Sequence, residues 1–157
     1  TNAVDEVIGA DGQPHNSIYA TIFRWRSAFQ NELAARMDWC VTEPHEANHP
    51  PLARLAHPAT MDVHYGDTVA LSAKGSSDPD GDELDYRWFV YREAGTYMGR
   101  PVLQNADQRD AKITIPKVTW REGQRSEEPK TLHVILEVTD RGKPALTRYR
   151  RTIITVW

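Results

Sequence analysis

The chain has 157 residues, which suits one domain with an additional segment or two very small domains. Hydrophobic residues make up 39% and charged residues 26%, so the chain can bury a core and wholesale disorder is disfavoured. The net charge of -3 argues against non-specific nucleic-acid binding, and no apolar run is long enough to span a membrane. The single cysteine, Cys40, excludes an internal disulfide framework and a cysteine-rich zinc site.

The first part of the chain differs in composition from the rest. Residues 1–50 carry 3 basic and 7 acidic side chains, a net charge of -4, whereas residues 51–157 carry 16 basic and 15 acidic side chains, a net charge of +1. Residues 1–23 are predicted to form an irregular leader, because Gly9, Gly12 and Pro14 interrupt it and residues 1–16 show no apolar period. Cys40 has no histidine base near it in the sequence, and we expect its thiol to be buried and inert.

A helical segment is predicted over residues 24–40. Its apolar side chains recur every four positions and form one stripe on a helix: Trp25, Phe29, Leu33 and Met37. Ser27 is the expected N-cap, which places the regular helix at 28–38. The stripe is expected to pack on the following domain, and the alternative is a groove for a ligand or partner. Residues 41–51 then contain Pro44, Pro50 and Pro51 and predict an extended linker.

From residue 52 to residue 157 the apolar pattern changes to a period of two, which is typical of strands. Alternating runs are found at 68–73, 84–90, 113–115, 132–138 and 147–156, with turn-like clusters between them, and a first strand is expected near 52–56 or 60–65. The predicted fold is all-β: an Ig-like antiparallel β-sandwich of about seven strands, with the N-terminal helical segment packed on it. The inward-facing residues are predicted to be Val69, Leu71, Leu84, Tyr86, Trp88, Ile113, Ile115, Leu132, Val134, Leu136, Val138 and Ile153.

The outer face of two of these strands is also apolar. Phe89 and Tyr91 lie on it in one strand and Ile135 in the other, where a solvated face would be mostly polar. The helical stripe is the best candidate within the chain to cover this face. The rival interpretation is an exposed aromatic platform that stacks on sugar rings.

Residues 75–84 form the sharpest local motif, GSSDPDGDEL. Its carboxylates, its proline and its glycine suit a tight inter-strand loop. Asp78, Asp80 and Asp82 also have a D-x-D-x-D spacing that calcium accepts, and Asp140 could join them from the end of a later strand. A structural turn and a calcium site both remain open. The motif is not an EF-hand, because the twelfth position holds Phe89 in place of glutamate.

Three aromatic residues could serve a carbohydrate site. Trp120 and Tyr97 fall in predicted loops, and Tyr91 lies on the apolar outer face. Anchoring a loop or filling a core is the commoner role for such residues, and sugar stacking is the functional alternative. The sequence contains no glycine-rich phosphate loop, GxSxG elbow or metal-ligand cluster of histidines, so we assign no catalytic residue.

The stretch FRWRSAFQNELAARMDW at 23–39 closely resembles a signature of secreted proteins often labelled cellulose-binding. In that family the N-terminal domain is similar to inosine-uridine nucleoside hydrolases, and the C-terminal domain is an Ig- or cadherin-like sandwich. Residues 75–88, 132–140 and 147–156 are similar to that sandwich. The PKD hallmark Trp-Asp-Phe-Gly-Asp is replaced here by Tyr86-Arg87-Trp88-Phe89, so the resemblance does not extend to PKD domains.

The resemblance implies a secreted or periplasmic C-terminal portion of a longer protein, whose N-terminal nucleoside-hydrolase-like domain is its partner in the same polypeptide. We therefore expect a non-catalytic accessory domain with polysaccharide as a further partner, no nucleic acid and no membrane span. The parent protein would be an N-glycosyl or glycoside hydrolase. The alternative is a structural part of a hydrolase, in which residues 24–39 help to shape the active site of the N-terminal domain. No cofactor other than calcium is expected.

Overall fold

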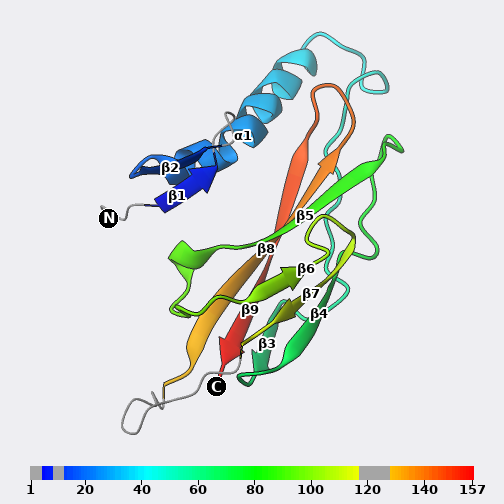
Figure 1. Ribbon diagram of the computed structural model, residues 1–157. Helices are drawn as coiled ribbons and strands as arrows, with labels where there is room; N and C mark the ends of the chain where they lie inside the picture. Colours follow the sequence, from blue (N-terminus) through cyan, green and yellow to red (C-terminus); the bar gives the residue numbers. More distant parts are fainter. Residues whose placement is uncertain (1–4, 9–12, 117–127) are drawn as a thin grey trace, which may run out of the picture.

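The computed structural model describes residues 5–8, 13–116 and 128–157, and it contains a short hairpin, one long helix and two larger β-sheets (Figure 1). The amino-terminal elements are β1 (Asp5–Ile8), β2 (Pro14–Ser17) and α1 (Ala20–Asp38). The strands that follow are β3 (Thr60–Val63), β4 (Thr68–Ser72), β5 (Leu84–Val90), β6 (Val102–Gln104), β7 (Asp110–Thr114), β8 (Lys130–Asp140) and β9 (Thr147–Val156), with a 3-10 turn, η1 (Arg92–Ala94), after β5.

The sequence predicted an irregular leader, but part of this segment forms a β-hairpin. β1 and β2 pair antiparallel, with Asp5 opposite Ser17. The Ser17 hydroxyl then accepts a hydrogen bond from the Tyr19 amide at 3.0 Å, and α1 begins at Ala20. The predicted cap at Ser27 is therefore wrong. No glycine or proline occurs between residues 15 and 38, so nothing in the sequence stops the helix from starting earlier.

Seven strands form the two sheets of a sandwich. One sheet has the order β3-β9-β8-β5 and the other the order β4-β7-β6. The grouping of β5 with β8 and β9, and of β4 with β6 and β7, is that of the central strands of Ig-like sandwiches. One pairing departs from the antiparallel prediction, because β3 runs parallel to β9, with Thr60 opposite Ile153. The parallel pairing is possible because β3 and β9 are not joined by a hairpin: the chain between them is long and contains β4 to β8.

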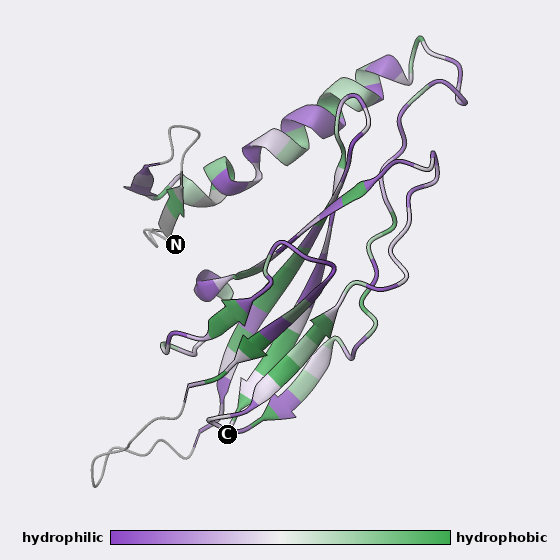
Figure 2. Cartoon of the chain, turned by 45° about the vertical axis from the view of Figure 1, so that its right-hand side comes forward, coloured by the Kyte–Doolittle hydropathy of each residue, from purple (hydrophilic) through white to green (hydrophobic). Residues whose placement is uncertain are grey.

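The core lies between the two sheets. Trp88 from β5 is 2% exposed, and its ring nitrogen donates to the Gln108 carbonyl at 3.0 Å. Leu71 and Ile113 face it from the other sheet and are 1% and 0% exposed. Figure 2 shows the hydrophobic residues of the sandwich strands, and it shows others along α1. The inward assignment of Ile153 is wrong: Ile154, at 0% exposure, joins the core, because the inward positions of β9 are the even-numbered ones.

Residues 41–51 are not a free extended linker. Ala47 donates its amide to the Glu43 carbonyl at 3.2 Å in a turn, and Pro51 is buried. The Asn48 carbonyl accepts a hydrogen bond from the Trp39 ring nitrogen at 2.9 Å, and the Asn48 amide group donates to the Pro144 carbonyl at 2.8 Å. The segment is therefore fastened both to the end of α1 and to the turn between β8 and β9.

Candidate functional site: the groove between the helix and the sheet

Trp25 anchors α1 to the outer face of the β5-β8-β9 sheet. Its ring meets the Tyr149 ring edge-on, with centroids 4.9 Å apart and an interplanar angle of 86°. It also contacts Phe89 at 5.8 Å and Tyr91 at 6.1 Å between centroids. Edge-to-face pairs of this kind add attraction beyond the burial of apolar area. The apolar outer face predicted from Phe89 and Tyr91 is therefore covered by the helix, as expected.

Polar contacts complete the docking on the side of the β8–β9 turn. The Glu32 carboxylate forms an ion pair with Arg148 at 2.8 Å between Oε2 and Nη1, and a second one with Arg36 at 2.8 Å. The Asn31 side-chain amide donates to the Ala145 carbonyl at 2.9 Å. These contacts place α1 beside the end of the hairpin where β8 turns into β9 (Figure 1).

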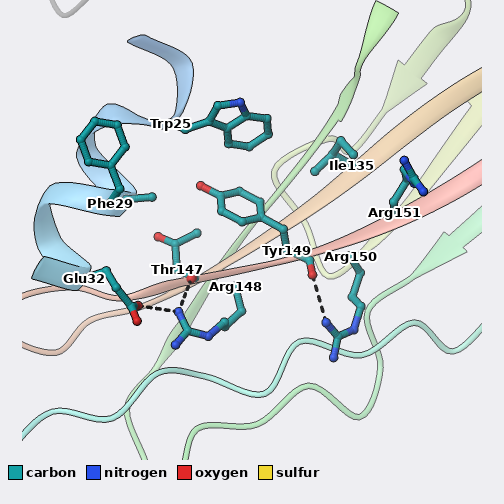
Figure 3. Close-up of a pocket in the computed structure, with 10 residues that line it drawn as sticks. Trp25, Phe29, Glu32, Ile135, Thr147, Arg148, Tyr149, Arg150 and Arg151 are labelled. Carbon is teal, nitrogen blue, oxygen red and sulfur yellow. Dashed lines mark hydrogen bonds and ion pairs between the residues drawn. The ribbon is translucent and has the colours of Figure 1, made fainter. Parts of the chain in front are cut away.

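A groove of 660 Å³ remains between α1 and the two strands, open to the outside. Figure 3 shows Trp25 and Phe29 on the helix side and Tyr149 on the strand side of this groove. The full lining is Trp25, Ala28, Phe29, Glu32, Ile135, Thr147, Arg148, Tyr149, Arg150 and Arg151. We call it the helix–sheet groove. Its walls are aromatic, and charged groups stand at its rim.

Two groups in the groove have shifted pKa values. The hydrogen bond from Arg148 lowers the pKa of the Glu32 carboxyl, with a smaller contribution from Arg36, so the carboxylate stays charged. Burial raises the pKa of the Tyr149 hydroxyl, and the nearby Glu137 carboxylate raises it further, so the phenol stays neutral. Arg87 binds both oxygens of Glu137, at 2.8 and 2.7 Å, which holds that carboxylate in place behind Tyr149.

The ten residues that line the groove include one carboxylate and three aromatic rings. Glu32 is the one carboxylate among its ten lining residues, and two arginines hold it. Glycoside hydrolysis ordinarily uses two facing carboxyl groups, of which one carries a proton. Aromatic walls with charged groups at the rim suit a ligand that has flat apolar faces and many hydroxyl groups.

The predicted apolar stripe splits into two parts. Trp25 packs on the sheet, but Phe29, Leu33 and Met37 are 50%, 61% and 66% exposed. The expectation that the whole stripe packs on the sandwich is therefore wrong for these three residues. Each turn of an α-helix covers 3.6 residues, so a repeat of four drifts around the helix and leaves the side that Trp25 faces. Cys40, expected to be buried, is also exposed.

Of the three residues predicted to bind sugar, the structure describes two, Tyr91 and Tyr97. Tyr97 is 5% exposed and belongs to the core cluster, where its ring lies 6.0 Å from that of Tyr65. Tyr91 is partly buried and lies against Trp25, with the Arg24 guanidinium 5.3 Å from its ring centre. Trp120 lies outside the described residues. Neither Tyr91 nor Tyr97 is among the residues that line the helix–sheet groove, where the aromatic side chains are Trp25, Phe29 and Tyr149.

The aspartates of the predicted calcium site lie close to one another. Asp78 Oδ1 accepts the amides of Asp80 at 2.9 Å and Asp82 at 3.2 Å, the geometry of a structural turn, and Gly81 has a φ of +84°. Burial raises the pKa of Asp82, and the charges of Asp78, Asp140 and Asp80 raise it further. Asp78 and Asp140 each have a buried Oδ2 atom with no hydrogen-bond partner.

These orphaned oxygens are compatible with a cation, but the cluster is incomplete. Within the described ranges, no three His, Cys, Asp or Glu side chains are arranged to hold a metal ion. Asp80 is engaged elsewhere, since it accepts the His49 amide at 2.6 Å and pairs with the His49 ring at 3.0 Å. Calcium binding at this loop therefore stays a prediction, whereas the hydrogen-bonded turn is present.

Sequence reasoning missed Tyr149 and the ion pair between Glu32 and Arg148. The signal for Tyr149 was available, because alternation along β9 puts it on the outer face with Arg151. The ion pair joins residues 116 positions apart, and no local pattern predicts such a contact.

Comparison with known proteins identifies the family. Residues 68–156 match the family described as the C-terminal domain of cellulose-binding protein Sde0182, and the chain belongs to that family. A solved structure of a nucleoside hydrolase-related hypothetical protein from Saccharophagus degradans, described as associated with carbohydrate metabolism, is 34% identical with a TM-score of 0.76. The match covers 94% of this chain and 36% of that one, so this chain spans about a third of its relative's length.

A second solved structure, the PKD domain from KIAA 1837 protein, is 17% identical over 67% of this chain and 88% of its own, with a TM-score of 0.43. The search of curated proteins returned no match. Among the described residues, no helix is long and apolar enough to cross a bilayer.

Proposed function

We propose that this chain is a non-catalytic accessory domain of a larger nucleoside-hydrolase-related protein, and that it binds a polysaccharide chain in the helix–sheet groove. The observation that carries the proposal is the aromatic lining of the groove, with Trp25 and Phe29 on one side and Tyr149 on the other. The family description and the carbohydrate association of the Saccharophagus relative support the class of ligand.

The chemistry of the groove suits a glycan. The C–H faces of a pyranose ring pack on aromatic side chains, and its hydroxyl groups hydrogen-bond to charged side chains at the rim. Arg150 and Arg151 are exposed, whereas Arg148 is already paired with Glu32. A volume of 660 Å³ lies in the usual range of ligand sites and suits a few sugar rings in an open groove. The cellulose-type backbone is the first ligand to test, and xylan is the second.

The test is a titration with cello- and xylo-oligosaccharides, followed by tryptophan fluorescence. Binding at millimolar ligand or below is expected for the native chain. Phe29→Ala should weaken binding about tenfold, because one stacking partner is lost. Leu33→Ala is the matched control, since Leu33 lies one turn further along the same helix and outside the groove lining. No fluorescence response at millimolar ligand would refute the proposal, as would equal effects of the two substitutions.

A second candidate function follows from the exposed residues of α1. In it, residues 24–39 form part of a hydrolase and help to shape the active site of an N-terminal domain. The exposure of Leu33 and Met37 favours this candidate, because large apolar side chains on a helix surface ordinarily pack against something. Assaying nucleosides and aryl glycosides with the full-length protein, native and with Leu33→Ala, tests it. An unchanged kcat/KM would refute it, and turnover by the 157-residue chain alone would overturn the non-catalytic assignment.

A further inference from the structure

The exposed apolar side chains of this protein are concentrated on one segment. Of the twelve large hydrophobic residues that are exposed in the described part of the chain, eight lie between residues 18 and 41. On α1 itself, four of them repeat along one side of the helix: Ile22, Phe29, Leu33 and Met37, between 50% and 66% exposed. We call these four residues the outer stripe. Soluble single domains rarely leave a continuous apolar strip of this kind in water.

The outer stripe is separate from the surface that holds α1 to the sandwich. The sheet-facing side of the helix carries Trp25, Glu32 and Ala35, which are partly or fully buried. At 100° per residue, the centre of the outer stripe lies roughly a quarter of a turn or more from that side. Phe29 stands at the border and also lines the helix–sheet groove. The helix therefore has two apolar sides, and the sandwich uses one of them.

The relative supplies the partner for the second side. Because the match covers 94% of this chain and α1 spans 19 residues, at least part of α1 has a counterpart in the Saccharophagus protein. That protein is described as nucleoside hydrolase-related, and 64% of its chain lies beyond the 36% that matches. We propose that the outer stripe is the docking surface for a nucleoside-hydrolase-related domain of the same polypeptide. This inference rests on the proposed function, in so far as that function makes the chain one domain of a larger protein.

The composition of the stripe indicates what the partner surface offers. Arg26 is exposed and lies on the same side of the helix, between Ile22 and Phe29. A complementary surface is therefore an apolar groove with an acidic group or carbonyl oxygens opposite Arg26, as in other helix-in-groove contacts. Such a docked helix would join the two domains rigidly, with α1 packed on the sandwich through Trp25 and on the second domain through Leu33 and Met37.

Hydrogen exchange of α1 in the full-length polypeptide and in the 157-residue chain tests the docking. The amides of residues 22–37 are expected to exchange at least about tenfold more slowly in the full-length protein than in the 157-residue chain, because docking suppresses local opening of the helix. Leu33→Asp combined with Met37→Asp should abolish the difference. Met98→Asp is the control, since Met98 is 87% exposed and lies far from α1 in the chain.

Equal exchange in the two native proteins would overturn the inference, as would a full-length coding sequence with no such domain. The double variant also separates this inference from sugar binding, because neither Leu33 nor Met37 lines the groove. If the double variant binds oligosaccharide normally but loses its protection, docking and binding are independent. If protection is intact and no protein form binds oligosaccharide, the glycan proposal fails and the docking stands.

Discussion

Replacing Trp25 by alanine removes the main apolar contact between α1 and the sandwich. Three aromatic partners surround the ring, at centroid distances of 4.9, 5.8 and 6.1 Å. Each such pair is worth about 0.5–1.5 kcal/mol beyond area burial. Full burial would bring the cost of truncation to about 3–5 kcal/mol, but Trp25 is only partly buried. We therefore expect a loss of about 2–3 kcal/mol.

This loss should appear in the docking of the helix and not in the global stability of the sandwich. The core cluster contains Trp88, Leu136 and Ile154 but not Trp25. Amides of α1 in the 157-residue chain are expected to exchange about 30- to 150-fold faster in Trp25→Ala, since every 1.4 kcal/mol is a factor of ten. The amides of β8 and β9 should keep their native exchange rates.

Leu33→Ala is the control, because Leu33 is 61% exposed on the same helix and both residue types are strong helix formers. It should change exchange of α1 by about twofold or less. Two results would refute the reasoning. One is exchange in Trp25→Ala within twofold of the native rate, which would mean that the ring contacts do not hold the helix. The other is unfolding of the sandwich together with the helix.

Three further predictions concern charged groups. Arg148 is the main cause of the lowered pKa of the Glu32 carboxyl, so the charged carboxylate stabilises the docked helix by about 1 kcal/mol at pH values above the ordinary pKa of 4.5, and this stabilisation is lost as the pH falls through the lowered pKa. Glu32→Gln should remove that part of the pH dependence of hydrogen exchange in α1, and a variant with the native pH profile would contradict the prediction. Asp140→Ala should lower the free energy of urea unfolding by about 2–4 kcal/mol, because Asp140 Oδ1 accepts the Leu146 amide at 2.9 Å and the Gly142 amide at 3.0 Å. Asp140→Asn keeps this acceptor and should cost about 1 kcal/mol or less, so equal losses in the two variants would show that these hydrogen bonds are not the cause. Millimolar calcium is expected to raise the melting temperature relative to EDTA, because Asp140 has a buried oxygen without a partner, and an unchanged midpoint would exclude a structural site.

The strands were predictable because alternation along a strand has a local cause. Residues 147–156 were predicted from their pattern and form β9 with the same bounds, and Leu132 to Val138 lie within β8. β6 was missed, since it has only three residues, two of them exposed, and carries no readable period. The parallel pairing of β3 with β9 was missed as well, because pairing between segments some ninety residues apart has no signature in either segment.

The site was harder to predict because the helix carries two apolar sides. A spacing of four residues made Trp25, Phe29, Leu33 and Met37 look like one stripe. The folded structure shows that Trp25 packs on Tyr149, whereas the other three side chains are 50% to 66% exposed. The apolar outer face of β5 correctly indicated that something covers it. Which residue does so depends on the rotation of α1, and long-range contacts such as the one between Glu32 and Arg148 set that rotation.

The most direct measurement of the central claim is an isotope-filtered NMR experiment that detects contacts between an unlabelled cello-oligosaccharide and the labelled chain. The account predicts NOEs from sugar ring protons to the side chains of Trp25, Phe29 and Tyr149, which line the helix–sheet groove, and none to the buried ring of Tyr97. NOEs confined to the β4-β7-β6 sheet, or none at saturating ligand, would contradict it.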